Sequence, residues 1–441
     1  MKFIADLHIH SKYSRATSKN LNLEELDRWA DDKGVLVIGT GDFTHPEWFR
    51  EIKEKLEPAE PGLLKLKSKY KLKTIKGTLA QTRFFLTSEI SSIYSREGKC
   101  YRNHNLIFAP DIETVEKINT QLGWVGNLKS DGRPILGLDV RELAKIVLNT
   151  DPRAYIVPAH IWTPWFSMFG SMSGFDSIEE CFGDYAKNIF AGETGLSSDP
   201  AMNWRLSQLD NIALISNSDS HSLQRIGREA NIFDTELSYD GIIEAIKSGA
   251  PSRRKEKKNK EKFIATIEFF PEEGKYHYDG HRNCNVVFSP KETKKHNGIC
   301  PKCGKKVTIG VMNRIEELAD RPEIKTKSKG YYQFYDNLVP FYNLIPLDEV
   351  IADVYNMGVK TKKVKEQYDK LIKNFGSELR LFLDTEEDEI KRKADSNIYS
   401  AIKALKEKKL KIEPGFDGEY GKISIFGEKT KKETEVQKSL F

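Results

Sequence analysis

The chain opens with Phe3-Ile4-Ala5-Asp6-Leu7-His8-Ile9-His10, a short apolar run that ends in two histidines. Side chains two residues apart on a strand point to the same side, so both imidazoles can face one ion. Parallel βα sheets carry their chemistry at the carboxyl ends of buried strands of this kind. The stretch therefore predicts an α/β fold with a metal site at the end of its first strand.

Six further apolar runs follow in the first 250 residues, and helical or loop stretches separate them. Helices are expected at 23–33, where Asn22 can serve as the N-cap, at 139–148 and at 239–248. Seven strands that alternate with helices predict parallel βα units. The six runs are 35–38, 84–86, 106–108, 155–157, 189–191 and 213–215.

Length and composition narrow the class of protein. The 441 residues predict about three domains, and the absence of an apolar run near ~18 residues excludes a spanning helix. Asp6 interrupts the first apolar run too early for a signal peptide, and five cysteines in a long chain favour a reducing compartment. We therefore expect a cytoplasmic protein with no membrane partner.

The formal net charge of +5 is too small to indicate a partner, but its distribution is uneven. Seven basic residues fall within 253–262, against two glutamates. This run is either a solvated linker or a strip that contacts phosphates.

Ligand-type residues gather at the ends of the predicted strands. Burying several imidazoles and carboxylates together without ions is costly, so we predict a cluster of two or three divalent cations. Mixed nitrogen and oxygen ligands suit Zn²⁺, Mn²⁺ or Fe²⁺ better than Mg²⁺, and such a cluster suits phosphoester hydrolysis. Glu193, at the end of the sixth run, is a ligand, a substrate contact or a cap. The predicted ligands are His8, His10, Asp42, His45, Glu89, His104, His160, Asp219 and His221.

These residues, in this order, resemble the polymerase-and-histidinol-phosphatase (PHP) family over residues 1–250. The resemblance implies a distorted (β/α)7 barrel with a trinuclear metal site. His221 would belong to the third ion. The family usually has a histidine where this chain has Phe43, and another beyond His10, so Asp42 or His45 substitutes or the third ion binds weakly. The first ion would be held by His8, His10, Glu89 and Asp219, and Glu89 would bridge to a second held by His104 and His160.

A second group of ligands lies further along the chain. His281-x₂-Cys284 and Cys300-x₂-Cys303 have the spacing of a closed tetrahedral site, which predicts a structural Zn²⁺ that folds this segment. His277 is an alternative to His281 as the fourth ligand. The remaining cysteines, Cys100 and Cys181, are expected to be ordinary thiols.

The wider context resembles the endonuclease Q family. The blocks that carry this resemblance are 160–165, 193–200, 267–282, the Cys300–Cys303 knuckle and 308–311. It implies a metal-dependent endonuclease that cuts DNA 5′ to uracil, hypoxanthine, xanthine or an abasic site, leaving 3′-hydroxyl and 5′-phosphate ends. Asp219, His8 and Glu89 are the expected catalytic residues. The domains would be the barrel at 1–250, a zinc-binding domain at 263–330 and a helical C-terminal domain at 331–428.

Several residues are candidates for contacts with partners. Trp162 and Trp165 could stack on DNA or pack as a lid, and Arg225 and Arg228 could bind phosphates or form surface ion pairs. In the polar tail at 429–441, expected to be flexible, the end resembles peptides that bind the replication sliding clamp. The clamp-binding residues would be Gln437, Leu440 and Phe441.

Three other functions compete with the endonuclease. The same barrel occurs in phosphatases of small phosphate esters, and a 3′–5′ exonuclease or a catalytically silent DNA-binding scaffold would share many features. A helicase is excluded because no G-x-x-x-x-G-K-[ST] phosphate loop occurs. The segment 412–423 has no chemistry that its sequence explains.

Overall fold

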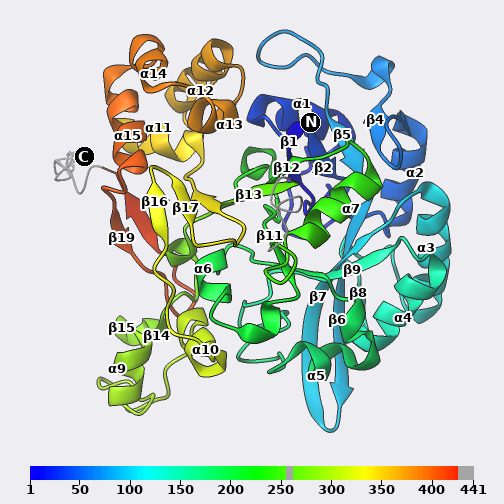
Figure 1. The fold of residues 1–441 in the computed structure, drawn as a ribbon, viewed down its shortest axis with the longest axis vertical. Coiled ribbons are helices and arrows are strands. Elements are labelled where there is room, and N and C mark those ends of the chain that lie inside the picture. The colour runs from blue at the N-terminus through cyan, green and yellow to red at the C-terminus, as the bar shows by residue number, and fades with distance from the viewer. Residues whose placement is uncertain (255–261, 426–441) are drawn as a thin grey trace, which may run out of the picture.

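The computed structural model describes residues 1–254 and 262–425 (Figure 1). Its largest sheet is built around the predicted first strand. β1 (Lys2–Asp6) runs parallel to β2 (Val37–Gly39), which runs parallel to β5 (Arg83–Phe85). On its other side β1 pairs antiparallel with β12 (Ala230–Asp234).

This sheet has ten strands and crosses the predicted domain boundaries. β13 (Phe263–Glu268) pairs with β12, and β18 (Phe341–Asn343) pairs with β13. The order is β16-β17-β18-β13-β12-β1-β2-β5-β4-β3. The segments predicted as separate domains are therefore joined by one sheet. Its remaining strands are β3 (Leu56–Pro58), β4 (Leu64–Leu66), β16 (Lys327–Lys329) and β17 (Tyr332–Phe334).

Six of the predicted strands form and the sixth in order is shifted from 189–191 to Ala191–Glu193, but no closed barrel that would match the expected distorted (β/α)7 fold is seen among the described residues. The other strands make a four-stranded sheet, β8-β6-β7-β9, and a parallel pair, β10-β11. Glu97 and Gly98 both have positive φ and join β6 directly to β7, so this pair is an antiparallel hairpin rather than a βα unit. These strands are β6 (Thr87–Arg96), β7 (Lys99–Phe108), β8 (Ile135–Leu136), β9 (Tyr155–Pro158), β10 (Ala191–Glu193) and β11 (Ala213–Ile215).

One apolar cluster connects these separate sheets. Leu7, Phe85, Phe108, Val157 and Ala213 belong to it and are buried. Since strands from all three sheets contribute, the three sheets pack against one another in one region. That region holds the predicted ligands.

The predicted helices are confirmed. α1 (Leu23–Lys33) begins after Asn22, whose side chain accepts a hydrogen bond from the amide of Glu25. α4 (Val140–Thr150) and α7 (Tyr239–Ser248) match the other two predictions. Figure 1 shows α2, α3 and α4 along the outer side of the part formed by residues 1–250, which we call the first unit. The further helices here are α2 (Pro46–Lys55), α3 (Ile112–Val125), α5 (Ile178–Phe182) and α6 (Pro200–Asn203).

The cysteine-bearing segment forms a small module at one end of the molecule (Figure 1). It contains the hairpin β14 (Asp279–His281) and β15 (Val286–Phe288), followed by α9 (Pro290–Lys295) and α10 (Val311–Leu318). A second hairpin, β19 (Lys411–Glu413) and β20 (Lys422–Ser424), extends towards this module.

Within the segment 331–428, which was expected to be helical, the helices lie between Leu347 and Lys406, whereas β17, β18, β19 and β20 are strands that pair with other parts of the chain or with each other. A buried ion pair attaches this region to the first unit, because Lys33 Nζ lies 2.6 Å from Glu378 Oε2. The helices are α11 (Leu347–Tyr355), α12 (Lys362–Phe375), α13 (Glu378–Leu383), α14 (Glu387–Lys393) and α15 (Ser396–Lys406).

Several predictions concern the remaining parts of the chain. No described helix is long and apolar enough to cross a membrane. Arg254 belongs to the predicted basic run but is buried, and it donates to the carbonyl oxygens of Phe263 and Asn337, so it is not a phosphate contact. Residues 255–261 and 426–441, which include Gln437, Leu440 and Phe441, lie outside the described residues.

Candidate metal centre

Four predicted ligands converge: His8 and His10 follow β1, Asp219 follows β11, and Glu89 lies near the start of β6. His10 Nε2 lies 3.1 Å from both Glu89 Oε2 and Asp219 Oδ1, and His8 Nε2 lies 3.5 Å from the same two oxygens. One ligand atom from each residue lies within 4.8 Å of the other three. This is the spacing that a single coordinated cation requires.

Three of the converging atoms have no hydrogen-bond partner. His8 Nε2, His10 Nε2 and Asp219 Oδ1 are buried, and none makes a hydrogen bond of normal geometry to any residue that the structure describes. Leaving a buried polar atom unsatisfied costs about 1–3 kcal/mol. A divalent cation would satisfy all three atoms, so the residues present fit a metal.

The electrostatics of this group also fit a cation. Burial by itself would lower the pKa of His8, but Glu193, Asp219 and Glu89 raise it well above its ordinary value. Burial would raise the pKa of Asp219, yet the neighbouring His8 and His10 hold it well below its ordinary value. Asp219 and Glu89, whose pKa is likewise held well below its ordinary value, are thus ionised and concentrate negative charge where the imidazoles meet.

A second group shares Glu89 with the first. Glu89 Oε1 lies 2.7 Å from His104 Nδ1 and 3.1 Å from His160 Nε2. The two imidazole nitrogens lie 3.2 Å apart. Since Oε2 of Glu89 faces the first group and Oε1 faces the second, this carboxylate can bridge two ions.

Two carboxylates lie behind the histidines and orient them. Glu193 accepts from His8 Nδ1 at 3.0 Å, from the amide of His160 at 2.8 Å and from Asn217 Nδ2 at 2.9 Å. Asp42 accepts from His10 Nδ1 at 2.9 Å. Each contact fixes its histidine so that Nε2 points to the metal group.

This arrangement gives Glu193 a role outside the three alternatives and corrects the expectation for Asp42. Glu193 positions His8 and His160. Asp42 was expected as a direct ligand, but its second oxygen accepts from the Ser11 amide and the Ser14 hydroxyl, so both oxygens are engaged. It therefore orients His10 from behind.

We expect Glu193→Gln to weaken Mn²⁺ binding about 10- to 100-fold. The neutral glutamine side chain no longer offers His8 Nδ1 the anionic acceptor that the carboxylate of Glu193 provides. Titration calorimetry with Mn²⁺ measures this affinity directly and needs no substrate. The exposed Glu236→Gln provides the matched control. An unchanged Mn²⁺ affinity in Glu193→Gln would show that Glu193 has no role in positioning.

The remaining predicted ligands lie at the edge of the centre. His221 is half-buried, and its ring centroid lies 4.6 Å from that of His10. His45 stacks on Tyr13 at 4.3 Å, where it precedes α2. Neither residue joins a converging ligand group in the described part of the chain, so the third ion stays a prediction.

The backbone is strained at three residues of the centre. Asp42, His160 and Asp219 have φ of 51°, 30° and 45°, in the left-handed region. Each such residue costs roughly 1–3 kcal/mol, and such strain gathers at functional sites. Surrounding hydrogen bonds hold it, for example from the His160 amide to Glu193.

A cavity of about 840 Å³ opens beside the metal groups. Trp165 lines it and meets Tyr276 edge-on, with ring centroids 5.4 Å apart. Across the mouth, Lys275 Nζ lies 4.5 Å from the ring of Tyr420, which is 71% exposed. The cavity therefore combines metal ligands with an aromatic and basic rim.

Sequence reasoning missed several residues of this cavity. Arg133 donates to Glu89 Oε2 at 3.0 Å, although it follows none of the predicted strands. Lys275 and Tyr276 lie in a block that the sequence singled out, and Tyr420 lies in the segment without assigned chemistry. No local pattern gives these residues a place in the cavity, because only the tertiary fold brings them to it.

The four predicted DNA contacts have different surroundings. Trp162 is buried, and its Nε1 donates to Asn203 Oδ1 at 2.6 Å, so the expectation that it stacks on DNA is wrong. Trp165 lines the cavity, as do Arg225 and Arg228. Arg225 is paired with Glu349, and Arg228 donates to the Ser218 carbonyl at 2.8 and 3.0 Å.

The four predicted zinc ligands come together in the small module. One atom each from His281, Cys284, Cys300 and Cys303 lies within 4.8 Å of the others. His277, the alternative ligand, is buried outside this group, and burial lowers its pKa to about 4. The sulfur-rich donor set fits Zn²⁺.

Comparisons with known proteins identify several relatives. A family model described as the MJ0043 C-terminal domain matches residues 346–409. Uncharacterized protein MJ0043 of Methanocaldococcus jannaschii is 35% identical over 325 residues, which are 71% of this chain and 38% of that protein. The chain thus spans 38% of that relative's length. Uncharacterized protein YqxK of Bacillus subtilis is 29% identical over 96% of this chain and 99% of that protein.

Two solved structures resemble the whole chain. The lesion-specific endonuclease PfuEndoQ from Pyrococcus furiosus is 30% identical, with a TM-score of 0.80 and 100% of both chains covered. A complex of Endonuclease Q with a 27-mer duplex substrate carrying an abasic lesion at the active site is also 30% identical. Its TM-score is 0.79, with 98% of this chain and 99% of that chain covered.

Proposed function

Because the chain belongs to the endonuclease Q family, we propose that it is a DNA-repair endonuclease that uses this metal centre to cut a damaged strand. The observation that carries the proposal is the pair of ligand groups sharing Glu89 beside the cavity of about 840 Å³. This volume lies in the range of about 300–1,000 Å³ typical of ligand sites, which suits an extruded nucleotide.

The finer proposal concerns the bond that is cut. The enzyme hydrolyses the phosphodiester on the 5′ side of uracil, hypoxanthine, xanthine or an abasic site and leaves 3′-hydroxyl and 5′-phosphate ends. Selecting such lesions requires the damaged nucleotide to leave the stack, which costs least where pairing is already weakened. The aromatic rim formed by Trp165, Tyr276 and Tyr420 suits the neighbouring bases.

The chain's own residues have distinct parts in this reaction. Divalent cations at the two groups would lower the pKa of water and neutralise phosphate charge. Glu193 and Asp42 hold His8 and His10 in the orientation that binds them. Arg133 presents its guanidinium to the cavity while it pairs with Glu89, so it can contact the phosphate being cut.

The zinc-binding module contributes to the cavity by holding residues at its rim. With Zn²⁺ bound to His281, Cys284, Cys300 and Cys303, the module would hold Tyr276 and Lys275 at the rim. Asp417 accepts from the Arg282 amide at 2.7 Å and from the Thr308 hydroxyl at 2.6 Å. These bonds attach the turn that carries Tyr420 to the module, which gives the segment at 412–423 a structural role.

We expect Tyr420→Ala to weaken binding of a lesion duplex about 5- to 150-fold, since stacking on one base contributes about 1–3 kcal/mol. Tyr420→Phe should keep affinity within about twofold, because the ring remains. Fluorescence anisotropy of a labelled duplex measures both. Trp124→Ala removes an aromatic side chain that is 81% exposed in α3 and serves as the control. Equal affinities of Tyr420→Ala and Trp124→Ala would rule out stacking.

The proposed function is tested with end-labelled duplexes that carry uracil, hypoxanthine, xanthine or an abasic site, incubated with Mn²⁺ or Mg²⁺. A single cut 5′ to the lesion is expected, and undamaged duplex should stay intact. A closed circle with one uracil distinguishes nicking from 3′–5′ exonuclease digestion. Rapid hydrolysis of small phosphate esters, with no cut in any duplex, would instead identify a phosphatase.

The sliding clamp is a further proposed partner. Its binding residues, Gln437, Leu440 and Phe441, lie outside the described residues, so the proposal depends on the sequence pattern alone. Loss of clamp binding on Leu440→Ala/Phe441→Ala, measured by calorimetry, would support it.

A further inference from the structure

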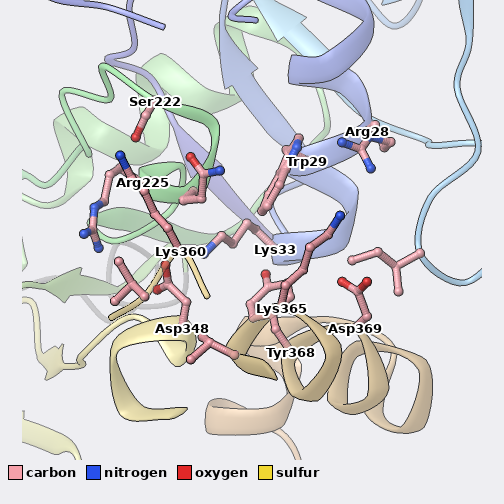
Figure 2. Close-up of a pocket in the computed structure, with 14 residues that line it drawn as sticks. Arg28, Trp29, Lys33, Ser222, Arg225, Asp348, Lys360, Lys365, Tyr368 and Asp369 are labelled. Carbon is pink, nitrogen blue, oxygen red and sulfur yellow. The ribbon is translucent and has the colours of Figure 1, made fainter. Parts of the chain in front are cut away.

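A second cavity, of about 370 Å³, lies between α1 of the first unit and the helical C-terminal region (Figure 2). Trp29 enters it from α1, and Lys365, Tyr368 and Asp369 enter it from α12 on the opposite side. We call it the α1–α12 cavity. Nothing described so far gives it a role.

Positive charge dominates this cavity. Its lining contains five cationic side chains and two aspartates. Arg28, Lys33 and Arg225 are paired with Glu25, Glu378 and Glu349, none of which lines the cavity.

The other two cations are available to a ligand. Lys360 and Lys365 form no ion pair in the part of the chain that the structure describes, and both are exposed. Figure 2 shows Lys365 extending from α12 towards Trp29 and Arg28. An anionic group bound here would therefore gain two cations without breaking an existing pair.

An aromatic surface lies beside these amines. Trp29 is half-buried, and its ring centroid lies 6.3 Å from that of Tyr368 at 34°. Val359 and Val364 extend the apolar wall, and Gln224 adds a hydrogen-bonding group. A flat aromatic ring next to lysines is the combination that binds a nucleobase and its phosphate.

The α1–α12 cavity adjoins the cavity of about 840 Å³ beside the metal centre, which we call the catalytic cavity. Ser222 and Arg225 line both cavities. These residues follow directly after Asp219 and His221 of the metal centre, in the turn that includes η4 (Leu223–Arg225). A strand whose phosphate lies at the metal centre therefore has a neighbouring basic and aromatic site within the same wall of the protein.

We propose that the α1–α12 cavity holds one nucleotide of the DNA strand beyond the catalytic cavity, with its base against Trp29 and its phosphates at Lys360 and Lys365. This inference rests on the proposed function, since it requires a DNA strand at the metal centre. The cavity would be a binding subsite that does not distinguish between bases. It would increase the affinity for the DNA strand next to the lesion. Its volume suits a single nucleotide rather than a duplex.

The first test removes the two free amines. Lys360→Ala/Lys365→Ala should weaken binding of a lesion duplex about tenfold and reduce the slope of log affinity against log salt by ~1.8, because each of two phosphate contacts contributes about 0.9 on duplex DNA. Lys370→Ala/Lys373→Ala removes the same charge from exposed positions of α12 outside the cavity. It should bind like the wild type. Equal salt slopes for the two double variants would overturn the proposal.

The second test locates the nucleotide. Lesion duplexes carrying one 5-iodouracil at successive positions on either side of the lesion are irradiated with the full-length protein, and cross-linked peptides are identified by mass spectrometry. One position should cross-link to Trp29. Cross-links confined to Trp165, Tyr276 or Tyr420 would place the strand only in the catalytic cavity and overturn the proposal.

A third arm distinguishes the source of the nucleotide. Thymidine monophosphate is titrated against the wild type and Trp29→Phe, with tryptophan fluorescence as the readout. Saturable binding of the free nucleotide without a strand cross-link to Trp29 would overturn the strand proposal. Nicking by the wild type reports on the proposed function, whereas the cross-link and salt slope report on this cavity, so the two can fail separately.

Discussion

Replacing Asp219 by asparagine should lower the rate of nicking at a lesion by about 10³-fold or more, since it removes charge from the group that binds an ion. The physical reason is the position of Asp219 Oδ1, which is buried, accepts no hydrogen bond from the described part of the chain and lies 3.1 Å from His10 Nε2. Asparagine has nearly the same shape but presents a neutral oxygen. The measurement is single-turnover cleavage of a duplex carrying uracil or an abasic site.

Metal content and folding separate this outcome from general damage. Asp219→Asn should lose at least one bound divalent ion but melt cooperatively, because His104, His160 and Glu89 retain the second group. Asp240→Asn, at an exposed position in the first turn of α7, is the matched control. Full activity of Asp219→Asn at unchanged metal loading would mean that the centre is wrongly assigned.

Replacing Cys300 by serine should remove one equivalent of Zn²⁺ and unfold the module around β14, β15 and α9. Structural zinc sites contribute about 10–16 kcal/mol of apparent free energy in small zinc-finger peptides, so the module cannot keep its fold by its apolar contacts alone. Cys300 is buried among only a few apolar side chains, including Val286, Phe288 and Val307. Zinc content by mass spectrometry and limited proteolysis of 276–318 measure the two effects.

Loss of the module should also reduce nicking. When the module unfolds, Asp417 no longer accepts hydrogen bonds from the Arg282 amide and the Thr308 hydroxyl. The turn that carries Tyr420 is then no longer held at the rim of the cavity. We expect at least about a tenfold loss of activity, comparable with removing one stacking contact. Cys100→Ser changes an exposed thiol outside the zinc group and should leave zinc, proteolysis and activity unchanged. A zinc-containing, protease-resistant Cys300→Ser protein would contradict the assignment.

Much of the fold was predictable because its signals are local. The apolar run at 3–7 and the N-cap at Asn22 depend only on neighbours in sequence, and β1 and α1 form where these patterns predict. The sheet order was not predictable. Glu97 and Gly98 make a hairpin where a βα unit was expected, and β13 returns to pair with β12 from beyond the predicted boundary.

The metal centre shows the same division. The order and spacing of His8, His10, Glu89 and Asp219 marked them as ligands, because residue type and position at a strand end are written in the chain. The roles of Asp42 and Trp162 could not be predicted from the sequence. The role of Asp42 depends on the hydroxyl and amide groups that donate to its second oxygen. The role of Trp162 depends on its hydrogen bond to Asn203, forty-one residues away.

The sequence by itself determined which residues can bind ions and which segments become strands and helices, since both follow from side-chain chemistry and short-range periodicity. Only the tertiary structure decided which carboxylates orient a histidine, and that Lys360 and Trp29 face one cavity. Those relations join residues far apart in the chain. They are set by how sheets and helices pack, and packing depends on the whole chain rather than on any one segment.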